Sequence, residues 1–208
     1  MCRPLVIQFA PMYIASQPIY AARMKGDAMT EALILIDLQN DYFPGGRMEL
    51  EGSIEAGHKA GKILAYFREN KKPLIHVQHI SSRPGATFLE AGTPGIEIHE
   101  SVKPAEGELI VQKHFPNSFR NTSLLEHLRA KNIDSLIITG MMTNMCVDAT
   151  VRAAFDYEFK SIVLSDACAN RGLLYKDIEI PAAYVHAAFI ASFTPIYAKV
   201  LTVDEYLA

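Results

Sequence analysis

The 208-residue sequence has few cysteines, no basic run and no long apolar run. Its three cysteines, Cys2, Cys146 and Cys168, form neither a CxxC pair nor a Cys/His zinc spacing. This pattern argues against a disulfide framework and favours the reducing cytoplasm. The formal charge of −3 comes without a basic stretch, so nucleic acid is not an expected partner. No window approaches the ~18 continuous apolar residues of a membrane span, so no membrane partner is expected either.

What the sequence does contain is the composition of a folded globular protein. Apolar residues make up 50% of the chain and charged residues 21%, which argues against intrinsic disorder. A chain of this length forms one domain with a full core, whereas two domains would be cramped.

The first 30 residues differ from the rest. Their apolar patches are interrupted by Pro4, Pro11 and Pro18, and a secretory signal needs an uninterrupted apolar core. We therefore predict a poorly defined N-terminal extension over residues 1–30 and a single domain over residues 31–208. The extension has three interpretations: a loosely packed arm, a partner-binding segment, or a reading frame begun at Met1 instead of Met29.

Short apolar runs alternate with helical patterns along the domain. Most of the apolar runs are continuous, which is typical of strands covered on both faces. This alternation predicts an α/β fold, a three-layer α/β/α arrangement around a parallel sheet of six strands. The expected strands cover residues 32–36, 74–78, 109–112, 136–139, 161–165 and 198–201, and the expected helices cover residues 54–70, 123–130, 144–157 and 180–192. The Gly- and Pro-containing gap over residues 80–108 is interpreted as a loop that covers the substrate, since loops of this length are usually functional.

The segment around Cys146 carries the strongest chemical signal. A buried-strand pattern ends at Gly140, Thr143 and Asn144 offer a helix cap, and Cys146 follows within the first helical turn. A thiol at a helix N-terminus is expected to have a lowered pKa, because unpaired N–H groups and the helix dipole favour the thiolate. The alternative is a small buried side chain, which is the usual role of a free cysteine.

Two other polar residues come at the carboxyl ends of predicted strands. Asp37 ends the first strand and Lys113 the third, while Cys146 follows the fourth. Taken singly, Asp37 could be solvated and Lys113 could extend to the surface. Because carboxyl ends of parallel strands share one edge of the sheet, we expect the three residues to meet there.

Three segments together resemble the isochorismatase-like cysteine hydrolases, a superfamily that includes nicotinamidases and N-carbamoylsarcosine amidases. They are residues 35–43, with Asp37; Lys113 with the Phe-Pro-Asn-Ser-Phe run of residues 115–119; and residues 140–147, with Cys146. The resemblance extends over residues 31–208 and implies the Rossmann-like hydrolase fold of that superfamily.

The resemblance also implies a catalytic triad. Cys146 would be the nucleophile, Asp37 the general base, and Lys113 the cation that orients Asp37 and favours the thiolate. Attack on an amide would give a thioester that water then hydrolyses. The family pattern places a cis peptide at Met141–Met142, and the backbone N–H groups of Met142 and Cys146 would form the oxyanion hole.

Two departures from family patterns narrow the function. Where nicotinamidases carry an Asp-x-His metal motif, this sequence has His79 and Ser81, so we expect no metal and no other cofactor. The histidines His76, His99 and His114 are the remaining conceivable ligands. Isochorismatases proper cleave a vinyl ether and generally lack the cysteine, so Cys146 favours the amidases.

The expected function is cysteine-dependent hydrolysis of a small amide or ureide. The alternatives are isochorismatase-type ether cleavage and a non-catalytic partner-binding domain. The family resemblance implies a homo-oligomer, a dimer or tetramer, and the apolar segment over residues 200–207 is an interface candidate. The loop after the fifth strand could add Arg171 or Tyr175 to the site. The expected pocket residues are Phe43, His79, Phe88, Asn117 and Phe119.

Overall fold

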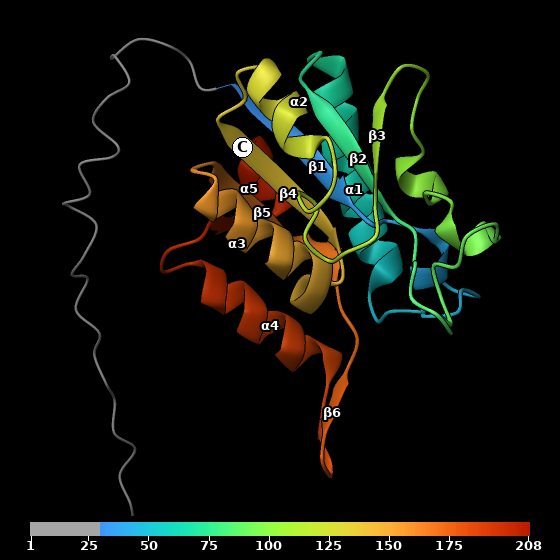
Figure 1. Ribbon diagram of the computed structural model, residues 1–208. Coiled ribbons are helices and arrows are strands. Elements are labelled where there is room, and N and C mark those ends of the chain that lie inside the picture. The colour runs from blue at the N-terminus through green and yellow to red at the C-terminus, as the bar shows by residue number, and fades with distance from the viewer. Residues whose placement is uncertain (1–29) are drawn as a thin grey trace, which may run out of the picture.

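The computed structural model describes residues 30–208 (Figure 1), so the predicted N-terminal extension lies outside the described residues except for Thr30. Six parallel strands form one sheet in the order β3-β2-β1-β4-β5-β8. This confirms the predicted three-layer α/β/α architecture with a six-stranded parallel sheet. The strands are β1 (Glu31–Ile36), β2 (Leu74–His79), β3 (Leu109–Lys113), β4 (Ser135–Met141), β5 (Lys160–Ala169) and β8 (Lys199–Leu201).

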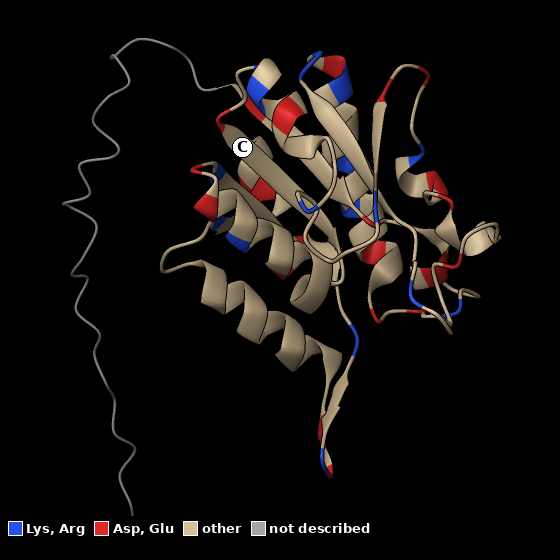
Figure 2. Cartoon of the chain, in the orientation of Figure 1, with Lys and Arg blue, Asp and Glu red and all other residues tan. Residues whose placement is uncertain are grey.

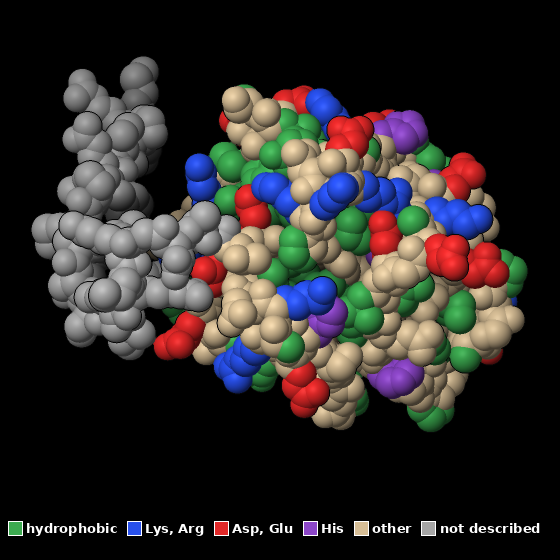
Figure 3. Space-filling view, turned by 90° about the horizontal axis from the view of Figure 1, so that it is seen from above, with side chains coloured by type: hydrophobic (Ala, Val, Ile, Leu, Met, Phe, Trp, Pro, Cys, Tyr) green, Lys and Arg blue, Asp and Glu red, His purple; other side chains and the backbone are tan. Residues whose placement is uncertain are grey.

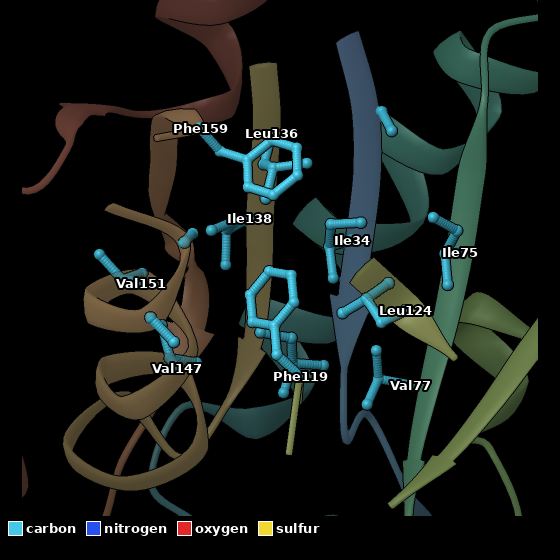
Figure 4. Close-up of a cluster of buried hydrophobic side chains, with 14 of the residues drawn as sticks. Ile34, Ile75, Val77, Phe119, Leu124, Leu136, Ile138, Val147, Val151 and Phe159 are labelled. Carbon is cyan, nitrogen blue, oxygen red and sulfur yellow. The ribbon is translucent and has the colours of Figure 1, made fainter. Parts of the chain in front are cut away.

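Helices cover both faces of the sheet (Figure 1). Apolar side chains from alternating strand positions pack in two clusters, one on each face. The first includes Ile34, Ile138 and Val151 and packs against the helices that follow β3 and β4 (Figure 4). The covering helices are α1 (Ser53–Glu69) and α5 (Val203–Leu207) on one face, and α2 (Leu124–Ala130), α3 (Asp148–Asp156) and α4 (Ala182–Phe193) on the other.

The chain reverses its direction of travel across the sheet at β1. It moves outward through β2 and β3, returns to pair β4 with β1, and continues through β5 to β8. In doubly wound folds of this kind, ligands bind outside the carboxyl ends of the strands that flank such a reversal. Here those strands are β1 and β4.

The helix after β4 begins differently from the prediction. A single π-helical turn, Thr143–Val147, precedes α3, and neither segment has a side-chain N-cap. The Thr143 hydroxyl instead donates a hydrogen bond to the Ala169 carbonyl, 3.2 Å away, and contacts His186 Nδ1 at 2.9 Å. The expected cap from Thr143 and Asn144 is therefore wrong, because Thr143 is turned toward β5.

A two-stranded hairpin after β5 was not predicted. The strands β6 (Leu173–Tyr175) and β7 (Ile178–Ile180) pair antiparallel and extend from the body beside one end of α4 (Figure 1). The short loop between them contains Lys176 at φ 54°, a left-handed conformation suited to a tight turn. The apolar side chains of this hairpin are largely exposed, so they do not show the buried pattern that identified the other strands.

The remaining segments complete the domain. Residues 200–207 belong to β8 and α5, where Val203 is buried and Tyr206 stacks on Phe67, so this expected interface segment packs within the chain. The gap over residues 80–108 contains two short helices. They are the 3-10 helices η3 (Pro94–Ile96) and η4 (Glu100–Val102). Another 3-10 helix, η2 (Asn40–Tyr42), follows β1.

The surface shows no block of one charge on the face in Figure 3, where basic and acidic side chains are interspersed. Charged residues are distributed over most elements, but α4 carries none (Figure 2). No helix within residues 30–208 combines the length and apolarity that crossing a bilayer requires.

Candidate active site

The residues of the site lie at the carboxyl ends of four neighbouring strands, β3, β2, β1 and β4. Lys113 ends β3, His79 ends β2, Asp37 follows β1 and Cys146 lies in the π-helical turn after β4. His79 and Lys113 are direct partners in the parallel register of β2 and β3. The sheet therefore brings the three predicted polar residues to one edge and places His79 among them.

Asp37 is completely buried and has an unusual backbone. Its φ is 52°, in the left-handed region that non-glycine residues rarely adopt and that recurs at functional sites. One carboxylate oxygen, Oδ2, accepts a hydrogen bond from Lys113 Nζ at 2.6 Å. The other, Oδ1, has no hydrogen-bond partner within residues 30–208. Asp37 Oδ1 is therefore a buried hydrogen-bond acceptor without a donor among these residues.

Lys113 is an equally buried cation with three hydrogen bonds. Its Nζ lies 2.6 Å from Asp37 Oδ2, 3.0 Å from His79 Nδ1 and 3.2 Å from the Phe115 carbonyl oxygen. Burial lowers the pKa of Lys113, but the charge and the hydrogen bond of Asp37, together with the neighbouring Cys146, outweigh burial and leave the pKa above its ordinary value. An ammonium group has three donors, and these contacts use all three.

Cys146 lies against this buried pair. Its Sγ is 3.9 Å from His79 Nδ1, and ligand atoms of Asp37, His79 and Cys146 all fall within 4.8 Å of one another. Burial and then the Asp37 carboxylate raise the pKa of the Cys146 thiol, and Lys113 only partly opposes them. The expected lowering of this pKa is therefore wrong, since desolvation dominates. The thiol keeps its proton until a base removes it.

The same cluster is compact enough to hold a metal ion. Asp37, His79 and Cys146 offer three ligand atoms, but Lys113 Nζ already donates to two of these residues. A metal ion would compete with this ammonium group. Of the other histidines considered as ligands, His76 pairs with Glu108, His99 stacks on Phe43 and His114 contacts the Ile80 carbonyl oxygen.

Gln39 fixes the backbone of His79, a role that the sequence analysis missed. The Gln39 side chain is fully buried. Its Oε1 accepts from the His79 N–H at 2.8 Å, and its Nε2 donates to the His79 carbonyl at 2.9 Å and to the Ile96 carbonyl at 2.8 Å. In the sequence, Gln39 was marked only by its place two residues after Asp37, in the segment that follows the first strand.

A cavity of about 490 Å³ opens onto Cys146. His79, Phe88, Met142 and Cys146 line it, and residues 81–89 of the long loop form one wall. Tyr42, Arg83 and Met145 also line it and were not predicted. No Asp or Glu is among the lining residues, which are Tyr42, His79, residues 81–89, His114, Phe115, Pro116, Met142, Met145 and Cys146.

Three expected pocket residues do not line this cavity. Phe43 is buried and stacks on His99, with ring centroids 3.5 Å apart. Phe119 packs in the core against Phe159, and Asn117 Oδ1 accepts from the Phe119 N–H. In each case the side chain packs against or hydrogen-bonds to a residue outside the cavity. Neither Arg171 nor Tyr175 lines it either: Arg171 contacts Met48 and Tyr175 lies on the exposed hairpin.

The backbone before the π-helical turn that carries Cys146 matches the family pattern in one respect. The Met141–Met142 peptide bond is cis, as the resemblance implied. Met142 and Cys146 both border the cavity. That the backbone N–H groups of Met142 and Cys146 form an oxyanion hole stays a prediction.

Comparisons with known proteins agree with the site. A family model described as the isochorismatase domain matches residues 31–205. The uncharacterized isochorismatase family protein YddQ of Bacillus subtilis is 45% identical over 179 residues, which cover 86% of this chain and 99% of the relative. The ureidoacrylate amidohydrolase RutB of Variovorax paradoxus is 26% identical over 231 residues, with 95% of this chain and 87% of the relative covered.

Solved structures show the same likeness. An isochorismatase from Pseudomonas putida has a TM-score of 0.80 at 32% identity, covering 88% of this chain and 94% of that one. N-carbamoylsarcosine amidase from Thermoplasma acidophilum has a TM-score of 0.71 at 26% identity, covering 85% and 98%. A buried cysteine, a carboxylate and an ammonium group thus lie together on a fold shared with isochorismatase family proteins and an N-carbamoylsarcosine amidase.

Proposed function

Because the chain belongs to the isochorismatase family of hydrolases, we propose that it cleaves the C–N bond of a small amide or ureide through a thioester on Cys146. One observation carries this proposal. A buried thiol lies beside a buried carboxylate that has one oxygen without a partner. The relatives that act on C–N bonds, a ureidoacrylate amidohydrolase and an N-carbamoylsarcosine amidase, support it.

The proposed reaction begins with a proton transfer. Asp37 Oδ1 takes the proton of the Cys146 thiol as Sγ attacks the substrate carbonyl carbon. The raised pKa of the thiol requires this base, because little thiolate exists at rest. Lys113 keeps Asp37 in place, and the N–H groups of Met142 and Cys146 would stabilise the oxyanion.

The second half releases both products. Asp37 returns its proton to the leaving nitrogen, the C–N bond breaks and an acyl thioester remains on Cys146. A water molecule then attacks the thioester carbonyl carbon while Asp37 accepts the proton of that water. Collapse of this second intermediate breaks the C–S bond, releases the acid, and Asp37 reprotonates the sulfur.

The cavity lining favours a substrate that carries negative charge. Arg83 lines the cavity, and none of the lining residues is acidic. Lys113 is buried close by, but its ammonium group is paired with the Asp37 carboxylate and adds no net charge. A small amide or ureide with a carboxylate group fits this lining.

Turnover of an amide and ureide panel tests the proposal. The panel contains nicotinamide, N-carbamoyl amino acids, ureido acids and a streptothricin-type cyclic amide, with ammonia or amine release as the readout. We expect Cys146→Ala to abolish turnover and Cys168→Ala to retain it. Added hydroxylamine should divert product to a hydroxamate, because it attacks the thioester.

Other outcomes would favour other functions. Vinyl-ether cleavage that survives in Cys146→Ala would indicate isochorismatase-type chemistry by Asp37 and Lys113. Absence of turnover on the whole panel, with a Cys146 that alkylates no faster than Cys168, would favour a non-catalytic binding protein. The chemistry proposed for Cys146 needs a reduced thiol, which suits the cytoplasm.

We also propose that the chain associates with a second copy through α4 and the β6–β7 hairpin. Tyr184 on α4 is 71% exposed, and Leu174 and Ile178 on the hairpin are 70% and 61% exposed. An isolated hairpin is marginal in water. Its charges, Lys176, Asp177 and Glu179, are of both signs, so two hairpins related by a two-fold axis can pair them.

Sedimentation velocity tests this association. Tyr184→Glu should shift the protein toward the monomer, whereas Ile54→Glu, on the opposite face of the sheet, should leave the assembly unchanged. A wild-type protein that sediments as a monomer would contradict the proposal.

A further inference from the structure

We propose that His79 is a fourth member of the catalytic assembly: Nδ1 accepts a hydrogen bond that positions Lys113, and Nε2–H donates one to the substrate. This inference rests on the proposed function, because it assigns His79 a part in the same site. From the sequence, His79 was expected only to line the pocket.

The protonation of His79 follows from Lys113. The two nitrogens, His79 Nδ1 and Lys113 Nζ, are 3.0 Å apart. A charged ammonium group can only donate, so Nδ1 must be the acceptor and carries no proton. The neutral imidazole then has its proton on Nε2. Burial, only partly opposed by the charge of Asp37 and assisted by the charge of Lys113, lowers the pKa of His79 to about 4, which agrees with a neutral ring.

Nδ1 has no capacity left for Cys146. It lies 3.9 Å from Cys146 Sγ and 3.8 Å from Asp37 Oδ2, but its one lone pair faces Lys113 at 3.0 Å. His79 is therefore not the base that deprotonates the thiol. Its effect on the thiol passes through the position of Lys113 and so of Asp37.

The ring is held firmly enough for this role. The Gln39 amide binds both the N–H and the carbonyl of His79, and the β2–β3 register pairs His79 with Lys113. Lys113 must pass the end of β2 to reach Asp37, since β2 lies between β3 and β1. His79 occupies that end, so its ring lies next to the Lys113 ammonium group.

Nε2 remains for the substrate. His79 borders the cavity, and its side-chain contacts with residues 30–208 all use Nδ1, which leaves Nε2 without a hydrogen-bond partner among them. The cavity floor thus offers a neutral N–H donor beside the nucleophile. It suits a carbonyl or carboxylate oxygen of the substrate, and it carries no charge to compete with Arg83.

The tautomer can be measured without any substrate. Nitrogen-15 NMR of the ¹⁵N-histidine-labelled full chain, with His79→Asn to assign the signal, should show Nδ1 unprotonated and Nε2 protonated at neutral pH. His58→Asn, which changes an exposed histidine, should leave this signal in place. A protonated Nδ1 or a charged ring would overturn the proposal.

Two substitutions separate the two nitrogens. Asn places its Oδ1 near the position of Nδ1 but cannot reach the position of Nε2, whereas Leu lacks both groups. We expect His79→Asn to raise KM about tenfold with kcat within about threefold of wild type. We expect His79→Leu to lower kcat at least about 100-fold as well, because Lys113 loses its acceptor. Equal kinetics for Asn and Leu would overturn the proposal.

Alkylation of Cys146 by iodoacetamide gives a readout that needs no amide substrate. Peptide mass mapping should show Cys146 reacting at a near wild-type rate in His79→Asn and at least about fivefold more slowly in His79→Leu. Equal rates in the two variants would remove His79 from the assembly. If the amide panel fails while this difference holds, the proposed function is wrong and the positioning role of His79 stands.

Discussion

Lys113 Nζ reaches Asp37 Oδ2 at 2.6 Å although the strands that carry them, β3 and β1, are not neighbours in the sheet. Both side chains are completely buried. A buried ion pair survives only when further hydrogen bonds compensate for the loss of water. Lys113 has such bonds to His79 and Phe115, whereas Asp37 keeps Oδ1 unpaired. Asp37 therefore has one carboxylate oxygen without a hydrogen bond, and it lies in the same cluster as Cys146.

Removing the ammonium group should convert the site into a metal site. Lys113→Met leaves Asp37, His79 and Cys146 with no cation between them, and all three are ligand types that zinc and cobalt accept. We expect turnover to fall at least about 100-fold and cobalt(II) affinity to rise at least about tenfold, because a like charge has been removed. The thiolate–cobalt absorption band measures this affinity.

The control for that prediction is the double variant Lys113→Met/Cys146→Ala, which lacks the sulfur ligand and should show no such band. If the wild-type protein binds cobalt(II) as tightly as Lys113→Met, Lys113 does not hold the position that we assign to it.

Gln39 should contribute to stability as well as to reactivity. Gln39→Met keeps the side-chain volume but leaves the N–H and carbonyl of His79 and the carbonyl of Ile96 without their partner. We expect the free energy of unfolding to fall by about 1–3 kcal/mol and Cys146 alkylation to slow. Urea titration measures the first effect. Gln112→Met removes an exposed contact to Gln78 and should stay within about 0.5 kcal/mol of wild type.

Gly140 should tolerate no side chain. Its φ is +140°, and an added Cβ would lie 2.0 Å from the Ile36 carbonyl oxygen, where β4 passes the end of β1. We expect Gly140→Ala to destabilise the fold by about 3 kcal/mol or more. Gly107→Ala also places a side chain at a positive φ, +83°, but with open space around it, and should cost about 1 kcal/mol. Thermal unfolding that ranks the two variants equally would contradict this account.

Glu108 should make stability depend on pH in the acid range. Hydrogen bonds from Arg68, and then from the Ala105 N–H and His76, outweigh burial and lower the pKa of Glu108 to about 2. A carboxyl with a lowered pKa stabilises the fold fully above its ordinary pKa of about 4.3, and this contribution disappears as the pH falls toward about 2.

The corresponding measurement compares the free energy of unfolding of wild type and Glu108→Gln across this range. The variant should be less stable near neutral pH, and the difference should shrink as the pH falls below about 4. Glu106→Gln, an exposed neighbour with the same charge change, should show no such trend. A constant difference would show that the Glu108 contacts do not depend on its charge.

Much of the framework follows from local sequence patterns. Continuous apolar runs identified all six strands of the sheet, most clearly β1 and β4, which are buried on both faces. The positions of Asp37, Lys113 and Cys146 at the ends of such strands predicted that they would meet. The hairpin escaped prediction, because Leu174 and Ile178 are apolar yet exposed.

The errors concern properties that local sequence does not contain. A lowered pKa was expected for Cys146 from its place before a helix, but the pKa depends on how much water the surrounding layers exclude. Phe43 and Phe119 were expected in the pocket, yet each has a packing partner distant in sequence. His79 was expected to line the pocket, but its contact with Lys113 depends on the register of β2 with β3.

The order of residues alone determined the layered fold and which side chains stand at strand ends, because the two periodicities of helix and strand are written in neighbouring residues. Only the folded chain decided which of those ends lie side by side, how deeply Cys146 is buried and which nitrogen of His79 holds a proton. Those properties arise from strand order, register and desolvation, which join residues from β1 to β4 that are far apart along the chain.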